Sequence, residues 1–154
     1  YLVSASKLTK VTFIDLRPHN IPIDNLETKV GDILSIPYDN ETVEYLTSLS
    51  VIEHIGLGRY GDKIDLQGMQ KSIDEFHRVL KVNGTLLVSF PIGSSNNIEF
   101  NAHRRFSPEK IYEMFNKFKI QDEIYILKNE IIDTKRFNKM GKPNGYACFN
   151  FTKR

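Results

Sequence analysis

The sequence predicts an α/β fold: a mixed sheet, mostly parallel with a C-terminal antiparallel hairpin strand, and helices on both faces. Apolar runs rich in β-branched residues alternate with segments of helical period, and such alternation requires parallel strands joined by crossover helices. Toward the C-terminus, two runs alternate apolar and polar residues, as antiparallel strands do. The 154 residues are enough for one domain around a single core, so we expect residues 1–154 to form one domain.

Strands are predicted where a short apolar run is bounded by turn residues. Residues 11–15 form a continuous β-rich run, as expected for a strand that is covered on both faces. We expect this strand to run parallel to residues 45–49 and 85–90 in one sheet, with 85–90 away from the edge. Residues 28–30 are a brief further strand. The antiparallel pair comprises residues 120–127 and 146–152, of which the second is placed near an edge.

Helical periodicity is clearest from residue 63 or 65 to about residue 82. Apolar side chains recur there every three or four positions on one stripe, namely Leu66, Met69, Ile73, Phe76 and Leu80. Gly84 is expected to end this helix in the left-handed conformation. A second helix is predicted to start at Ser107 and Pro108, since a capping hydroxyl is followed by proline in the first turn. Residues 129–145 are predicted to be a polar connection.

Charge and cysteine content exclude several classes of protein. The net charge of +2 does not demand a nucleic-acid partner. The single cysteine, Cys148, excludes an internal disulfide and argues against a cysteine-based metal site. No apolar run approaches the length of a membrane span and no signal peptide is visible. We therefore expect a cytoplasmic protein.

A polar, glycine-rich segment follows the predicted strand at residues 45–49. It contains Glu53, His54, Arg59, Tyr60 and Asp62, interleaved with glycines. Glycine lets the backbone turn sharply and approach a ligand, and ionisable groups just past a strand lie where open α/β sheets bind ligands. A polar loop with glycines for turns explains the composition equally well, and the flanking elements favour a site.

Two carboxylates stand at strand ends in the first part of the chain. Asp15 closes the strand at residues 11–15, and Asp32 follows the next strand, before Ile33 and Leu34. A carboxylate in this position can accept hydrogen bonds from ribose hydroxyls, and an acid followed by aliphatic side chains suits an adenine edge. The competing interpretation for each residue is a helix cap or a turn former.

The order of these segments resembles the class I S-adenosylmethionine-dependent methyltransferases. The segments are VTFIDLRP, GDILSIPYDNETVEYLTSLSVIEHI, and a helix ending in EFHRVLKVNGTLLVSFP. The resemblance implies a Rossmann-like sheet and S-adenosylmethionine as the cofactor. It assigns Asp15 to the ribose and Asp32 with Ile33 to the adenine, and Ser50 is counted with the cofactor-binding residues. In such proteins a first strand and a Gly-rich loop precede the segment at Val11, so we expect them upstream of Tyr1. The position beside residues 11–15 should then be vacant in this chain.

A narrower resemblance is carried by SVIEHIGLGRYGDKIDLQG and FNAHRRFSP. These segments are similar to a small methyltransferase-like family of unassigned function, of the DUF268 type. The hallmark residues are 51–65 and 100–104. This likeness is more specific than the first, but it implies little biochemistry.

Methyl transfer requires an acceptor atom held close to the methyl group, and often a base that takes the acceptor's proton. His54 and His103 are the predicted bases, although each could be a loop histidine bonded to backbone. His103 could also belong to an anion-binding surface with the neighbouring arginines. Glu53, Arg59, Tyr60, Asp62 and Arg104 are the predicted substrate-binding residues. The oxygen and nitrogen groups of this loop are too nonspecific to predict a metal site.

These observations lead to a methyltransferase domain that acts on a small-molecule or carbohydrate acceptor. One rival is a binding module of the same fold without cofactor. A second rival is an enzyme that binds a nucleotide-sugar or NAD on a similar sheet, since Asp15 would serve a ribose there too. We expect no nucleic-acid partner, and the oligomeric state is open, with a homo-oligomer among the options.

Overall fold

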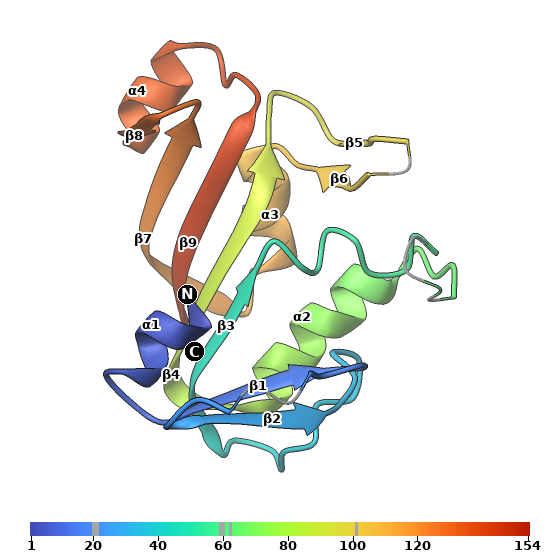
Figure 1. The fold of residues 1–154 in the computed structure, drawn as a ribbon. Helices are drawn as coiled ribbons and strands as arrows, with labels where there is room; N and C mark the ends of the chain where they lie inside the picture. The colour runs from blue at the N-terminus through green and yellow to red at the C-terminus, as the bar shows by residue number, and fades with distance from the viewer. Residues whose placement is uncertain (20–21, 59–60, 62, 101) are drawn as a thin grey trace. The chain divides into compact units, whose positions relative to one another are not determined.

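The computed structural model describes residues 1–19, 22–58, 61, 63–100 and 102–154. The chain divides into two compact units, Tyr1–Tyr38 and Asp39–Arg154. Each unit is described by itself below. The strands and helices of both are labelled in Figure 1.

The first unit contains a helix and a two-stranded parallel sheet. Helix α1 (Leu2–Ser6) precedes strand β1 (Val11–Asp15), which pairs in parallel with β2 (Leu26–Val30). The predicted strand at residues 11–15 is therefore confirmed. It pairs with β2 in a two-stranded sheet, and among the described residues this pairing is separate from that of the strands at 45–49 and 85–90. Because a vacant position was expected beside residues 11–15, the separate pairing does not contradict the predicted sheet.

The second unit is built on a five-stranded mixed sheet of order β3-β4-β9-β7-β8. Its strands are β3 (Val43–Leu49), β4 (Leu80–Ile92), β7 (Phe118–Leu127), β8 (Glu130–Ile132) and β9 (Gly145–Lys153). Strands β3 and β4 are parallel, and the remaining pairs are antiparallel. The short strands β5 (Asn97–Ile98) and β6 (Arg104–Arg105) form a hairpin that follows β4 in Figure 1.

The placement of residues 146–152 near an edge was wrong, because β9 is the third of the five strands. It is inserted between β4 and β7, with Ala147, Phe149 and Phe151 buried. The edge position is taken by β8 within residues 129–145, where we expected only a connection. The same stretch also holds helix α4 (Thr134–Lys139), which begins at Asp133, whose carboxylate accepts a hydrogen bond from Arg136 N.

The predicted long helix is shorter than its apolar stripe suggested. Helix α2 (Gly68–Val79) ends where residues 80–82 enter β4, and Leu66 lies outside the helix and is exposed. The predicted left-handed Gly84 was also wrong, since Asn83 has the positive φ of 63°. Gly84 is needed for space, because a Cβ there would lie 2.8 Å from Lys81 O. The second predicted helix is confirmed as α3 (Pro108–Met114), with the Ser107 hydroxyl capping Lys110 N.

An aromatic core holds the second unit together. Phe115, at the end of α3, stacks on Phe151 of β9 with ring centroids 4.7 Å apart, and Phe90 of β4 contacts Phe115 and Phe149. Phe137 of α4 stacks on Tyr125 of β7 at 4.2 Å. This cluster fixes β4, and with it the loops that follow β3 and β4.

Candidate functional site

The candidate site begins where β3 ends. Ser50 has a positive φ of 54°, and its hydroxyl lies 3.2 Å from that of Ser89 on β4. Three tight turns follow, closed by hydrogen bonds from His54 N to Val51 O, from Ile55 N to Ile52 O, and from Leu57 N to His54 O. Ile52 is fully buried and anchors this segment. The name site loop is used below for residues 50–58.

Gly56 is required by the geometry of the site loop. Its φ of +77° is a conformation that residues with side chains rarely adopt, and an added Cβ would overlap the carbonyl oxygen of Asp65. Gly56 O in turn accepts a hydrogen bond of 3.0 Å from Asp65 N. The glycine therefore lets the chain return closely past the site loop before α2 begins.

His54 and His103 lie next to each other. Their ring centroids are 6.1 Å apart, and the rings meet edge to face at 83°. His54 Nδ1 lies 2.8 Å from the carbonyl oxygen of Ala102, in the turn of the β5–β6 hairpin. A carbonyl can only accept, so Nδ1 carries the hydrogen, and in the neutral ring Nε2 has the lone pair. The loops after β3 and β4 thus bring the two predicted histidines together, as expected for segments that follow neighbouring parallel strands.

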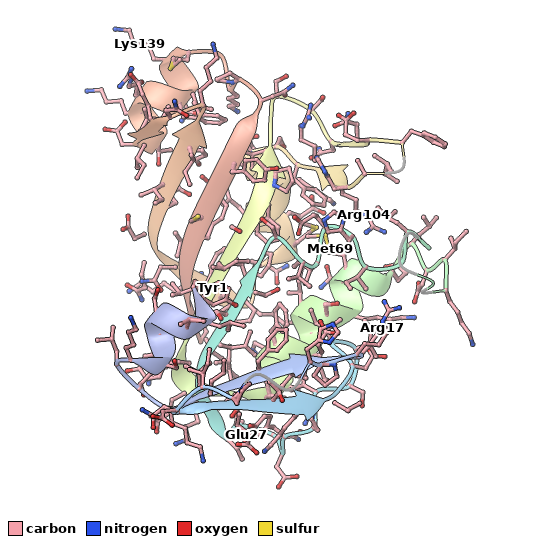
Figure 2. All side chains as sticks on the ribbon, in the orientation of Figure 1. Tyr1, Arg17, Glu27, Met69, Arg104 and Lys139 are labelled. Carbon is pink, nitrogen blue, oxygen red and sulfur yellow. The ribbon has the colours of Figure 1, made fainter. Side chains whose placement is uncertain are left out.

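Arg104 clamps the site loop to the hairpin. Its side chain, labelled in Figure 2, is buried, and Nη1 donates to Ile55 O at 2.6 Å. The backbone N–H of Arg104 also donates to Glu53 O at 3.1 Å. These contacts hold the backbone on either side of His54. Arg104 therefore has a structural role in addition to the substrate-binding role that was predicted from the sequence.

Glu53 is buried behind His54. Its side chain is 1% exposed, and Oε1 lies 3.8 Å from His54 Nε2. Among the described residues, the other carboxyl oxygen, Oε2, has no hydrogen-bond partner. Burial raises the pKa of Glu53 from 4.5 to about 7, because desolvation disfavours the carboxylate. A sequence can show that a carboxyl follows a strand, but only the folded chain decides whether that carboxyl is buried.

The two carboxylates predicted to bind the cofactor lie at one edge of the first unit's sheet. Asp15 ends β1, and its carbonyl oxygen accepts a 3.0 Å hydrogen bond from Gly31 N, directly before Asp32. Each side chain also forms a local turn: Asp15 Oδ1 accepts from Arg17 N and Asp32 Oδ1 from Leu34 N, both at 2.8 Å. Such turns are what the competing interpretation predicts, and they use one carboxylate oxygen of each residue.

The remaining predicted residues, Arg59, Tyr60 and Asp62, lie outside the described part of the chain. Within the part that is described, no group of three His, Cys, Asp or Glu side chains could hold a metal ion. No helix among those residues is long and apolar enough to cross a membrane.

A hollow that was not predicted lies between α3, β7 and α4. It measures about 460 Å³ and is lined by Tyr112, Ile120, Gln121, Asp122, Glu123, Asp133, Thr134 and Lys135. Glu123 accepts hydrogen bonds from the Tyr112 and Thr134 hydroxyls at 2.8 and 2.6 Å. Burial, together with the bonds to Tyr125 and Glu123, raises the pKa of Tyr112. The Glu123 carboxylate is therefore already the shared acceptor of two hydroxyl groups.

The segments that contain the site loop and the hairpin both lie in a part of the chain that matches a protein-family model. Residues 22–140 match the model of a family described as "Caenorhabditis protein of unknown function, DUF268". The chain belongs to the DUF268 family. No curated protein matches the sequence.

Solved structures of similar fold include methyltransferases and a cyclase. Geranyl diphosphate C-methyltransferase from Streptomyces coelicolor A3(2), in complex with Mg²⁺, geranyl diphosphate and S-adenosyl-L-homocysteine, has a TM-score of 0.68 at 12% identity, over 99% of this chain and 66% of that one. For a SAM-dependent methyltransferase from Methanosarcina mazei the TM-score is 0.65 at 12% identity, over 99% and 85% of the two chains. The cyclase SpnF has a TM-score of 0.67 at 14% identity, over 98% and 69%. At these identities the likeness establishes the fold: this DUF268 chain is Rossmann-like, as in class I methyltransferases.

Proposed function

We propose that this DUF268 protein is an S-adenosylmethionine-dependent methyltransferase that acts on a small-molecule or carbohydrate acceptor. The observation that carries the proposal is the likeness of nearly the whole chain to methyltransferases, one of them in complex with S-adenosyl-L-homocysteine. The bound cofactor would supply a methyl group on a positively charged sulfur. The chain's own residues would bind it, hold the acceptor and take the acceptor's proton.

The β1–β2 edge fits the nucleoside part of this cofactor. Asp15 and Asp32 follow adjacent parallel strands at the same edge, the arrangement that nucleotide-binding sheets use for ribose and base. Asp15 would accept hydrogen bonds from the ribose hydroxyls, and Asp32 with Ile33 would meet the adenine. Ser50, at the end of β3, is also proposed as a cofactor-binding residue.

The site loop fits the chemistry of the acceptor. Nε2 of His54 is the proposed proton acceptor, because Nδ1 is held by Ala102 O. His103 adjoins the ring and is the second proposed base. Glu53, Arg59, Tyr60, Asp62 and Arg104 are the proposed substrate-binding set. A planar Arg59 fork on phosphate or carboxylate and a Tyr60 ring against a sugar would suit a carbohydrate-type acceptor.

An alternative is an enzyme of this fold that catalyses a different reaction. The cyclase SpnF is the observation that favours it, since its name describes a cyclisation on the same fold. A binding module without cofactor and an enzyme for NAD or nucleotide-sugars are further outcomes of the same experiment. Isothermal titration of the full-length protein with S-adenosylmethionine, S-adenosylhomocysteine, NAD and a uridine diphosphate sugar separates them. We expect only the first two ligands to bind.

Asp15→Ala tests the ribose assignment. Losing hydrogen bonds to a charged carboxylate costs about 1.5–3 kcal/mol, or roughly ten- to a hundredfold in S-adenosylmethionine affinity. Asp15→Asn should lose less, because an amide oxygen still accepts one bond. The matched control is Asp24→Ala, which removes an exposed carboxylate from the same unit. Unaltered affinity in a folded Asp15→Ala protein would overturn the assignment, and a wild type that binds no S-adenosylmethionine would overturn the function.

A further inference from the structure

Glu53 is the ionisable group of the site loop whose role the proposed function leaves open. Its carboxyl is 1% exposed, and Oε2 has no hydrogen-bond partner in the described structure. An isolated carboxylate in such surroundings is costly, so the group must either hold a proton or face a cation. A merely structural residue at this position would gain more from an uncharged side chain. The burial therefore points to a group that changes its charge in use.

The neighbour able to become that cation is His54. Its Nδ1–H is held by Ala102 O, so the second proton of the ring can bind only at Nε2. Nε2 lies 3.8 Å from Glu53 Oε1, beyond hydrogen-bond length but well within the range of a strong charge interaction. In apo proteins such catalytic contacts are often long and shorten when ligands bind.

We infer that Glu53 and His54 bind and release one proton as a unit, with Glu53 the positioning residue that makes His54 a proton acceptor. The pair has a neutral form, in which Glu53 holds the proton beside a neutral imidazole. It also has an ionic form, in which a Glu53 carboxylate faces a His54 imidazolium. Burial raises the pKa of Glu53 to about 7, so its carboxyl can hold or release a proton near neutral pH.

The catalytic part of this inference rests on the proposed function. A bound S-adenosylmethionine would supply the methyl group and keep the carbon–sulfur bonding electrons on sulfur, while the acceptor's oxygen or nitrogen would bond to the methyl carbon and lose its proton. The step would start from the pair without its proton, a neutral His54 imidazole beside the Glu53 carboxylate, and the proton would go to Nε2 of His54. The positive charge lost at sulfur thus reappears on the imidazolium, where the Glu53 carboxylate stabilises it. The proton later leaves to solvent, which restores the starting charges.

Further charged groups stand on the hairpin and on the returning chain, both of which are hydrogen-bonded to the site loop. Arg104 donates to the carbonyl oxygens of Glu53 and Ile55, and the His103 ring meets His54. Asp65 is paired with Lys71, and Glu99 with Arg105. Glu53→Gln leaves all of these groups in place and removes only the carboxylate of the pair. A change in His54 titration between wild type and this variant therefore reports on Glu53.

The test is a pH titration of the full-length protein by ¹H–¹⁵N NMR of the histidine ring nitrogens. The His54 signals are identified by their loss in His54→Gln. In wild type we expect the Nδ1–H form of the neutral ring. In Glu53→Gln the midpoint of the His54 titration should fall by at least about one pH unit, a tenfold weaker binding of the proton. Glu53→Asp keeps a carboxylate and should retain part of the effect.

Two controls fix the interpretation. Glu99→Gln removes a carboxylate from the neighbouring hairpin and should leave the His54 midpoint in place, and His77, on α2, should titrate identically in every variant. An unchanged His54 midpoint in folded Glu53→Gln overturns the pairing. If that variant does not fold, a neutral wild-type ring that carries its hydrogen on Nε2 overturns it, because Nε2 could not then accept the proton. Failure to bind S-adenosylmethionine with the midpoint shift present would overturn the proposed function and leave the proton-sharing pair established.

Discussion

Gly56→Ala tests how the site loop is held, because this position combines two separate costs. The first is conformational, since a residue with a side chain at φ +77° loses about 1–2 kcal/mol. The second is steric. The new methyl group would overlap the carbonyl oxygen of Asp65 and lie 2.9 Å from its carbonyl carbon. That clash involves backbone atoms, so it can be relieved only if the returning chain moves away.

Gly141→Ala is the matched control for the first cost alone. Gly141 has a nearly identical φ of +76°, but nothing lies within 4 Å of its added Cβ. Its substitution should cost about 1–2 kcal/mol of unfolding free energy. Gly56→Ala should lose about 3 kcal/mol, because the displaced chain also gives up the hydrogen bond from Asp65 N to Gly56 O.

Urea unfolding at constant pH measures the two losses, and hydrogen exchange of the Asp65 amide locates the difference. We expect the Asp65 amide to lose protection in Gly56→Ala and to keep it in Gly141→Ala. Equal losses of stability in the two variants, with the Asp65 amide still protected, would refute the clash and leave only the strained backbone.

Two further predictions concern the residues around His54. The pKa of Glu53 is raised from 4.5 to about 7, so its stabilising contribution is complete below pH 4.5 and is lost as the pH rises through 7. Between pH 5 and pH 8 the unfolding free energy of wild type should therefore fall by up to about 3 kcal/mol relative to that of Glu53→Gln. Urea unfolding at several pH values measures both proteins, and parallel pH profiles of their unfolding free energies would contradict the prediction. Arg104→Lys should cost about 1–3 kcal/mol of unfolding free energy, since the point charge of lysine cannot reproduce the part-buried hydrogen bond from Nη1 to Ile55 O. Arg105→Lys should cost less, because Arg105 makes an ion pair with the partly exposed Glu99. Urea unfolding compares the two arginines, and a larger loss in Arg105→Lys would show that Arg104 is not the clamp.

Local sequence signals were enough for most elements that they predicted. The strand at residues 11–15 and the start of α3 at Ser107 and Pro108 follow from β-branched runs and from capping chemistry, which act between neighbours in the chain. The meeting of His54 with His103 was also predictable, because segments after neighbouring parallel strands emerge at one edge of a sheet. The family, too, was evident in the hallmark segments at 51–65 and 100–104.

Other elements were determined by tertiary structure, because long-range packing overrides their local preference. Residues 80–82 have helical spacing but belong to β4, where Val43 pairs with Leu80, so the left-handed residue is Asn83 and not Gly84. Strand β9 takes an interior position because its aromatic side chains complete a core formed with β4, β7 and α3.

The chemistry of the site loop shows the same division. The sequence alone placed a carboxyl next to a histidine just past a strand, and that determined the kinds of group available. Only the folded chain decided their properties: Ala102 O fixes the hydrogen of His54 on Nδ1, and the fold buries Glu53. The charge of a carboxyl depends on how much water and which cations surround it, and those surroundings come from residues about fifty positions away in the chain, brought near by the parallel strands that they follow.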